Sequence, residues 1–141
     1  MTAPLRQRFR ALRETQGRDQ NEIAAAIGVA QPSISNWENG HRTPRTHHAA
    51  AWATALNHRL IVTRNGQLIG DLQDVLPKLG SLRRTLGYSR NDVTRRLHLA
   101  CLSNIESRAA GGGRLQLPTI DRYLAAIGCR IDLHPSEVNP C

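Results

Sequence analysis

One internal repeat limits what this chain can fold into. Residues 12–29 can be set above residues 82–99 with a constant offset, and Leu12/Leu82, Arg13/Arg83 and Gly17/Gly87 are among the pairs that coincide. Two further matches follow in the same order. Residues 35–38 match 103–106, and residues 55–60 resemble 126–131. Order is shared as well as composition, so we interpret the chain as a tandem duplication. A length of 141 residues allows one compact domain or two very small ones.

Apolar residues at helical spacing predict four helices in the first copy. Leu5, Phe9 and Leu12 give the first helix, which Gly17 ends. Asp19 is expected to cap the second helix. The third helix runs from about residue 31 to 40, and the fourth fits residues 46–56. The expected inward positions of the last three helices are Ile23, Ala24, Ile27, Ile34, Trp37, Trp52 and Leu56.

Each copy is expected to end in strands. Residues 59–64 and 67–69 flank Asn65-Gly66, which is a strong hairpin signal. Residues 129–134 alternate between apolar and polar side chains and predict a second strand segment, which can pair with the first. The predicted fold class is therefore mainly α. The predicted organisation is a first domain over 1–70, a linker over 71–78, a second domain over 79–134 and a tail over 135–141.

A longer motif in the first copy carries a family resemblance. The pattern Gly17-x-Asp19-Gln20-x-Glu22-Ile23-Ala24-x-x-Ile27-Gly28-Val29-x-Gln31-x-x-Ile34-Ser35-x-Trp37-Glu38-x-Gly40 resembles the Cro/phage-repressor (Xre) helix-turn-helix family. The resemblance spans residues 5–56 without a gap and places Gly28 at the tight turn between the two helices of the motif. It implies a lambda-repressor-like domain that places its second motif helix in the major groove of DNA.

The second copy resembles the same family with departures. Residues 87–93, 104–106 and 117–124 match the pattern. Between Leu99 and Ser103 the second copy is two residues shorter than the first between Val29 and Ser35, and His98 replaces Gly28. Residues 111–113 are three glycines before the last helix. The resemblance therefore implies two tandem domains, of which the second is divergent.

The resemblance also implies one ion pair in each copy. Arg13 with Glu38, and Arg83 with Glu106, resemble the family's pair that joins the first helix to the end of the third. A partly buried pair of this kind fixes geometry more than it adds net stability.

The charge balance favours a polyanionic partner. The chain carries 19 basic and 11 acidic side chains, and its formal net charge is +8. Lys78 is its only lysine, and the other basic residues are arginines, which suit bidentate contacts with phosphate and guanine. Together with the resemblance, this balance points to double-stranded DNA as the partner.

Polar side chains on the third helix of each copy are the candidate DNA contacts. Amides and hydroxyls can hydrogen-bond to base edges, whereas arginines and helix starts suit phosphates. A solvated helix face is the alternative explanation for these residues. The candidates in the first copy are Gln20, Gln31, Pro32, Ser33, Ser35, Asn36, Asn39, Arg42 and Arg45, and those in the second are Arg90, Cys101, Ser103, Asn104, Ser107, Arg108 and Arg114.

Several classes of protein do not fit the sequence. No apolar run approaches the ~18–20 residues of a membrane span, and no signal peptide is apparent. Cys101, Cys129 and Cys141 show no metal-ligand spacing, so we expect no zinc site, no disulfide scaffold and a reduced, cytoplasmic protein. Cys129 is expected in the core. No nucleophile–base set or phosphate loop is present, so we expect no enzyme and no cofactor.

These features favour a sequence-specific transcriptional regulator, either a phage-type or a host repressor. The alternative is an antitoxin that binds a toxin protein and autoregulates its operon, and a pure interaction adaptor is a third option. The chain is expected either to dimerise or to form an intramolecular pseudo-dimer through its two strand segments. In the latter case one chain reads two different half-sites, whereas otherwise the second copy is a dimerisation or positioning module.

Overall fold

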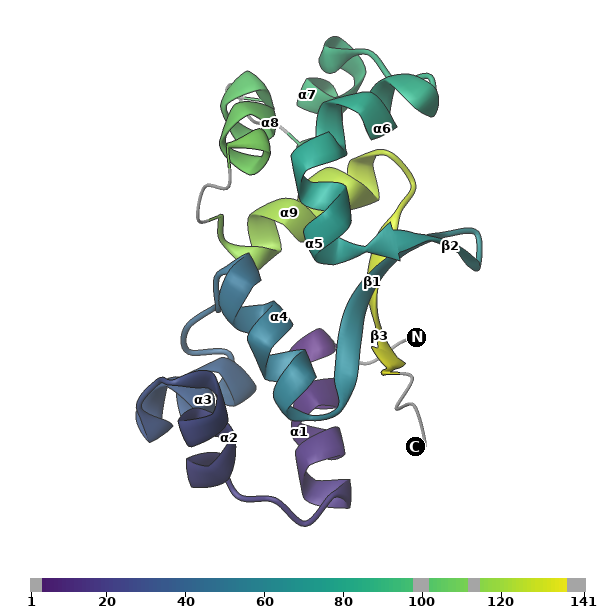
Figure 1. Cartoon of the computed structure of the whole chain (residues 1–141). Coiled ribbons are helices and arrows are strands. Elements are labelled where there is room, and N and C mark those ends of the chain that lie inside the picture. The colour runs from purple at the N-terminus through teal and green to yellow at the C-terminus, as the bar shows by residue number, and fades with distance from the viewer. Residues whose placement is uncertain (1–3, 98–101, 112–114, 137–141) are drawn as a thin grey trace. The chain divides into compact units, whose positions relative to one another are not determined.

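The computed structural model describes residues 4–97, 102–111 and 115–136 (Figure 1). The chain divides into two compact units, which are Met1–Leu60 with Leu133–Cys141 and Ile61–Asp132. We call them unit 1 and unit 2. Their boundaries fall inside two strands of one sheet, whereas the sequence predicted a linker over 71–78.

Unit 1 contains the four helices that the sequence predicts. They are α1 (Leu5–Thr15), α2 (Gln20–Ile27), α3 (Gln31–Asn39) and α4 (Thr46–Ala55). Aromatic side chains hold α1, α3 and α4 together, because Phe9 stacks on Trp52 with ring centroids 3.9 Å apart and Trp37 lies 5.4 Å from Trp52. The predicted inward residues are buried, except Ile27, which is half-buried.

The turn between α2 and α3 depends on glycine. Gly28 has a φ of 88°, a left-handed conformation that a side chain with a Cβ rarely adopts. The start of α2 is capped as predicted, because the Asp19 carboxylate accepts a hydrogen bond from the Glu22 backbone N–H at 2.9 Å. Helix α2 therefore begins at a capping carboxylate and ends at a glycine turn.

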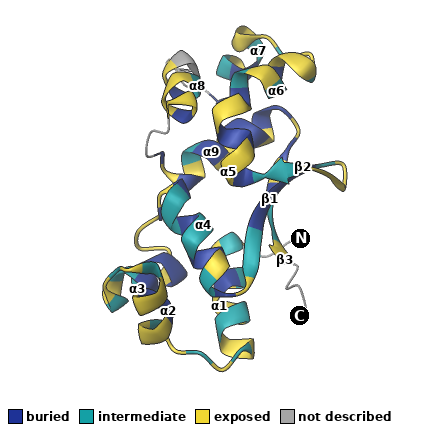
Figure 2. Ribbon diagram, viewed as in Figure 1, coloured by how far each residue is buried: buried dark blue, intermediate teal, exposed yellow. Residues whose placement is uncertain are grey.

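The strands form one three-stranded sheet with the order β2-β1-β3. The hairpin of β1 (His58–Arg64) and β2 (Gln67–Asp71) turns at Asn65-Gly66, where both residues have positive φ, as the hairpin signal predicts. Their antiparallel register shifts between Val62 and Thr63, which marks a β-bulge. The tip of the hairpin is exposed (Figure 2). β3 (Arg130–Pro135) lies on the other side of β1, so the two strand segments pair as expected.

Unit 2 is also mainly helical. Its elements before β3 are α5 (Leu72–Val75), the 3-10 helix η1 (Leu76–Lys78), α6 (Leu79–Thr85), α7 (Arg90–Leu97), α8 (Leu102–Ala110) and α9 (Leu117–Ala126). The segment predicted as a linker is thus helical, and three of its residues, Leu72, Val75 and Leu76, are buried. These three side chains follow helical spacing together with Leu79, which is the physical reason for the difference.

Helices in unit 2 repeat several features of unit 1. α7, α8 and α9 have 8, 9 and 10 residues, the same lengths as α2, α3 and α4. The chain turns with positive φ at Gly87 before α7, as it does at Gly17 before α2. The core of unit 2 consists largely of aliphatic side chains, among them Leu72, Leu79, Val93, Ile105, Ile120, Leu124 and Ile127.

Candidate nucleic-acid interface

Helix α3 presents one buried face and one polar face. Ile34, Trp37 and Glu38 are buried against the rest of unit 1. The predicted base-reading residues of this helix are at least partly accessible. Pro32 is exposed, and Gln31, Ser33, Ser35 and Asn36 are half-exposed.

A chain of hydrogen bonds holds the first residue of α3 to α2. The Gln31 amide Nε2 donates to Gln20 Oε1 at 2.6 Å, and the Gln20 amide Nε2 donates to Glu38 Oε1 at 3.1 Å. Gln20 therefore bridges Gln31 and Glu38, and its predicted contact with a phosphate stays a prediction. Gln31 keeps its amide oxygen and a second N–H for another partner.

The hydrogen-bond chain ends at the predicted ion pair. Arg13 Nε donates to Glu38 Oε2 at 2.7 Å, and Arg13 Nη2 donates to Glu38 Oε1 at 2.9 Å. The hydrogen bonds to Glu38 outweigh the opposing effect of burial and raise the pKa of Arg13. Arg13 Nη1 also donates to the backbone oxygen of Arg18 at 3.0 Å. The pair thus ties α1, the segment before α2 and the end of α3 together.

The predicted phosphate contacts after α3 are accessible. Asn39, Arg42 and Arg45 are exposed, and the Asn39 amide lies 3.4 Å from Ser35 Oγ. Arg6 is a residue that the sequence analysis missed. Its Nη1 donates to the backbone oxygen of Glu38 at 3.4 Å. Its position seven residues before Arg13 on α1 could have indicated that both arginines reach the end of α3.

Unit 2 contains the second predicted ion pair with an added partner. Arg83 Nε donates to Glu106 Oε2 at 2.8 Å, and the Tyr123 hydroxyl donates to the same oxygen at 2.7 Å. Burial alone would raise the pKa of Glu106, but the hydrogen bonds from Arg83 and Tyr123 lower it overall. Burial, followed by the hydrogen bond to Glu106, raises the pKa of Tyr123. The sequence gave no prediction for Tyr123.

The predicted DNA contacts of unit 2 are only partly described. Arg90, Asn104, Ser107 and Arg108 are exposed on α7 and α8, and Ser103 belongs to α8. Cys101 and Arg114 lie outside the described residues.

A reciprocal capping box at the start of α7 was also missed. The Asp92 backbone N–H donates to Ser89 Oγ at 3.1 Å, and the Ser89 backbone N–H donates to Asp92 Oδ2 at 2.9 Å. The spacing Ser-x-x-Asp was the available signal.

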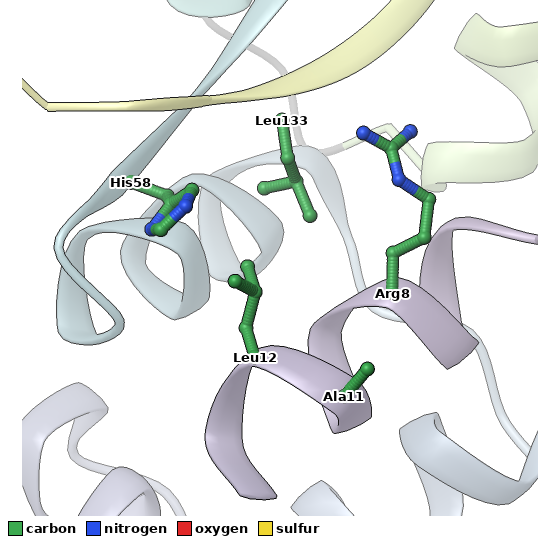
Figure 3. Close-up of a pocket in the computed structure, with 5 residues that line it drawn as sticks. All are labelled: Arg8, Ala11, Leu12, His58 and Leu133. Carbon is green, nitrogen blue, oxygen red and sulfur yellow. The ribbon is translucent and has the colours of Figure 1, made fainter. Parts of the chain in front are cut away.

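Unit 1 has a shallow hollow away from the polar face of α3. It has a volume of about 250 Å³ and is lined by Arg8, Ala11, Leu12, His58 and Leu133. Leu12 and Leu133 point toward each other across it (Figure 3). It contains no cluster of polar groups that would orient a ligand.

Taken together, α2, the turn at Gly28 and α3 define a helix-turn-helix motif with an uncharged polar face, which is the architecture of DNA-binding regulators. Residues 9–59 match the helix-turn-helix family. The match supports the Cro/phage-repressor (Xre) type for this part of the chain and binding to double-stranded DNA. It does not extend to the second copy. Comparison with curated proteins and with solved structures finds no match.

Membrane-spanning helices and metal-binding clusters are two further features to consider. Within the described residues, no helix is both long and apolar enough to cross a membrane. The same part of the chain contains no group of three or more His, Cys, Asp or Glu side chains placed to hold a metal ion.

Proposed function

We propose that the chain is a sequence-specific transcriptional regulator that reads duplex DNA with α3 in the major groove. The observation that carries the proposal is the fixed amide of Gln31. One of its N–H groups is held by Gln20, which leaves a carbonyl oxygen and a second N–H at the start of α3. A donor and an acceptor side by side are what a bidentate contact with adenine requires.

Asn36 is the second proposed base-reading residue. It lies five residues after Gln31 on α3 and is half-exposed. Among the described residues, its side chain makes no hydrogen bond that would compete with a base. An amide with both donor and acceptor available can pair with adenine in the same way as Gln31. In the second unit, the exposed Asn104 on α8 is the corresponding proposed contact.

The test begins with selection of duplexes that the full chain binds from a random library. Affinities of the Asn36→Ala variant are then measured for an enriched duplex and for a scrambled duplex of the same length. We expect the variant to lose about 1–3 kcal/mol of discrimination between the two. Equal weakening on both duplexes would show that Asn36 does not read bases, and absence of any enriched sequence would refute the proposed function.

Arg45→Ala is the matched control. Arg45 is exposed in the segment after α3 and carries charge without an amide. A phosphate contact should weaken binding to all duplexes about equally and flatten the salt dependence by about one unit. The contrast between the two variants separates base reading from phosphate binding.

One observation favours the second candidate function, an antitoxin that binds a toxin protein. Leu68 and Ile69 are neighbouring large apolar side chains on β2 and are 56% and 39% exposed. A protein partner could cover them. Co-expression with the product of any small adjacent reading frame tests this function. If the native chain binds that product and the Leu68→Ser/Ile69→Ser variant does not, the antitoxin function is favoured. If the native chain does not bind it, the regulator is the only proposed function that remains.

A further inference from the structure

A hollow in unit 2 gathers arginines and serine hydroxyls, of which Arg90 and Ser107 are also predicted DNA contacts. It lies against η1, α6, α7 and α8 and has a volume of about 260 Å³. Arg84 and Ser81 line it from α6, Arg90 lines it from the start of α7, and Ser107 lines it from α8. Arg84 Nη2 lies 3.4 Å from Ser81 Oγ, so these two side chains already share one side of the hollow.

The hollow has a net positive charge. Glu106 also lines it, but the guanidinium of Arg83 neutralises this carboxylate at 2.8 Å. Tyr123 donates a further hydrogen bond to Glu106 and is itself buried. The charge of Arg90 also lowers the pKa of Glu106. Arg83, Arg84 and Arg90 therefore outnumber the single carboxylate at the hollow, which keeps a net positive charge.

Gly80 allows the hollow to have this shape. A Cβ added at Gly80 would lie 2.9 Å from Glu106 Oε1 and 3.5 Å from Arg84 Nη1. Any side chain at this position would push Glu106 away from α6. The glycine thus lets the neutralised carboxylate approach α6 and leaves the space beside Arg84 open.

The size and lining of the hollow fit a small anion. Sites for drug-sized organic ligands usually enclose about 300–1,000 Å³ and are lined mainly by apolar side chains. This hollow is smaller, and beside Pro77, Gly80 and Ala110 its lining includes two guanidinium groups and two hydroxyls. Guanidinium groups match the oxygens of a phosphate in geometry and charge. We propose that the hollow binds a backbone phosphate of duplex DNA and anchors unit 2 to the double helix.

The charge of the hollow belongs to the second copy alone. In the repeat, Glu14 stands where the second copy has Arg84, and it pairs with Arg10 at 2.8 Å. Gln20 stands where the second copy has Arg90, and its amide bonds to Glu38. The first copy therefore has an amide where the second copy has a guanidinium. This difference assigns phosphate binding to the hollow of unit 2.

This proposal rests on the proposed function, because it takes duplex DNA as the partner. The test measures the affinity of the full chain at several NaCl concentrations for an enriched duplex and for its scrambled counterpart. Arg84→Gln and Arg90→Gln each remove one charge from the hollow. Arg95→Gln is the control, because Arg95 lies on the same helix as Arg90, has a side chain 78% exposed and pairs with Asp92 outside the hollow.

We expect Arg84→Gln and Arg90→Gln to weaken both duplexes by the same factor. Each should also lower the slope of log affinity against log salt by about 0.9, the value for one lost phosphate contact. Arg95→Gln should leave the slope unchanged. Unchanged slopes for the two hollow variants would overturn the proposal. An equal change in the control would also overturn it, because the effect would then come from charge spread over the surface.

Two additional results separate this proposal from others. Saturable binding of inorganic phosphate, followed by NMR of the arginine side chains, with an unchanged salt slope would assign the hollow to a free anion and overturn the proposal. If the library yields no enriched sequence while the hollow variants still lower the slope on duplexes of random sequence, the proposed function fails and the phosphate site stands.

Discussion

At the scale of single residues, each unit pairs one glutamate with one arginine, but the further hydrogen-bond partners of the two glutamates differ. Each contains a buried glutamate that an arginine from an earlier helix neutralises, Glu38 by Arg13 and Glu106 by Arg83. The remaining acceptor positions are used by the Gln20 amide in unit 1 and by a tyrosine hydroxyl in unit 2. A buried carboxylate is tolerated only when it is paired and hydrogen-bonded.

Removing the carboxylate in unit 1 should be costly. Glu38→Ala leaves the Arg13 guanidinium without its partner in a site where its side chain is 13% exposed. We expect the free energy of unfolding to fall by about 3–5 kcal/mol, which is typical when one member of a buried pair is lost. Urea denaturation followed by circular dichroism measures the change.

Glu14→Ala on α1 is the control for Glu38→Ala. Glu14 also pairs with an arginine, but both side chains of that pair are 55% exposed. An exposed pair contributes at most about 1 kcal/mol. A similar loss of stability in both variants would contradict the structural role of Glu38.

The ion pair in unit 2 should make stability depend on acidic pH. The folded pKa of Glu106 is lower than its ordinary value of 4.5. Its stabilising contribution is therefore fully present above the ordinary value and is lost as the pH falls through the lower, folded pKa. Urea denaturation at pH 7 and at pH 3 should show this loss in the native sequence, and a Glu106→Gln variant should show a smaller pH dependence. An unchanged pH dependence in the variant would contradict the assignment.

At the scale of elements, several helix ends are stabilised by side chains that lie far from them in the sequence. Three arginines donate to the last carbonyls of helices: Arg18 to Ala55 of α4, Arg96 to Ala126 of α9 and Arg122 to Leu97 of α7. Cations at such positions satisfy carbonyls that lack a helical partner and complement the helix dipole. Arg18 therefore has a structural role at the end of α4.

The cap at the start of α2 gives a prediction at this scale. Asp19→Ala removes the acceptor for the Glu22 N–H, and we expect a loss of about 1 kcal/mol in the free energy of unfolding. Asp19→Asn retains an oxygen acceptor and should lose less. Thermal denaturation of both variants checks the order, and an equal loss would mean that charge, not the hydrogen bond, stabilises the helix start.

Local chemistry explains which elements were predictable. The hairpin at Asn65-Gly66 and the turn at Gly28 were predicted because their backbone conformations restrict the residues they accept. The helical segment over 72–78 was missed because Pro77 and the acidic residues suggested a linker. Pro77 is nevertheless tolerated, since it lies in the first turn of η1.

The candidate site was predictable in its residue types more than in its contacts. The ion pairs followed from the family resemblance, and the structure confirms both. The bond between Gln20 and Gln31 could not be predicted, because it depends on how two helices pack across a turn. The contact of Tyr123 with Glu106 joins residues from different helices and has no sequence signal of its own.

At the scale of the whole molecule, the net charge of +8 has two uses. Arg13, Arg83 and the three capping arginines form bonds inside their units and keep helices in place. The salt dependence of DNA binding should therefore be weaker than the full count of arginines suggests.

The tandem repeat that we infer from the sequence predicts an unusual binding unit. We expect the free protein to scatter light as a monomer and to protect a site that is not a strict palindrome, because α3 and α8 carry different side chains. Light scattering and footprinting on an enriched duplex check this. A stable dimer on a palindromic site would instead assign the second copy to dimerisation.

The division of the chain also bears on the order in which the protein can be completed during synthesis. Unit 1 includes residues on both sides of unit 2, and the Ser136 backbone N–H donates to Asn57 O at 3.0 Å within it. The ribosome therefore releases the helices of unit 1 first and the strand residues that finish it only after the whole of unit 2. A nascent chain stalled before residue 133 would therefore carry α1–α4 without the β3 residues that belong to unit 1.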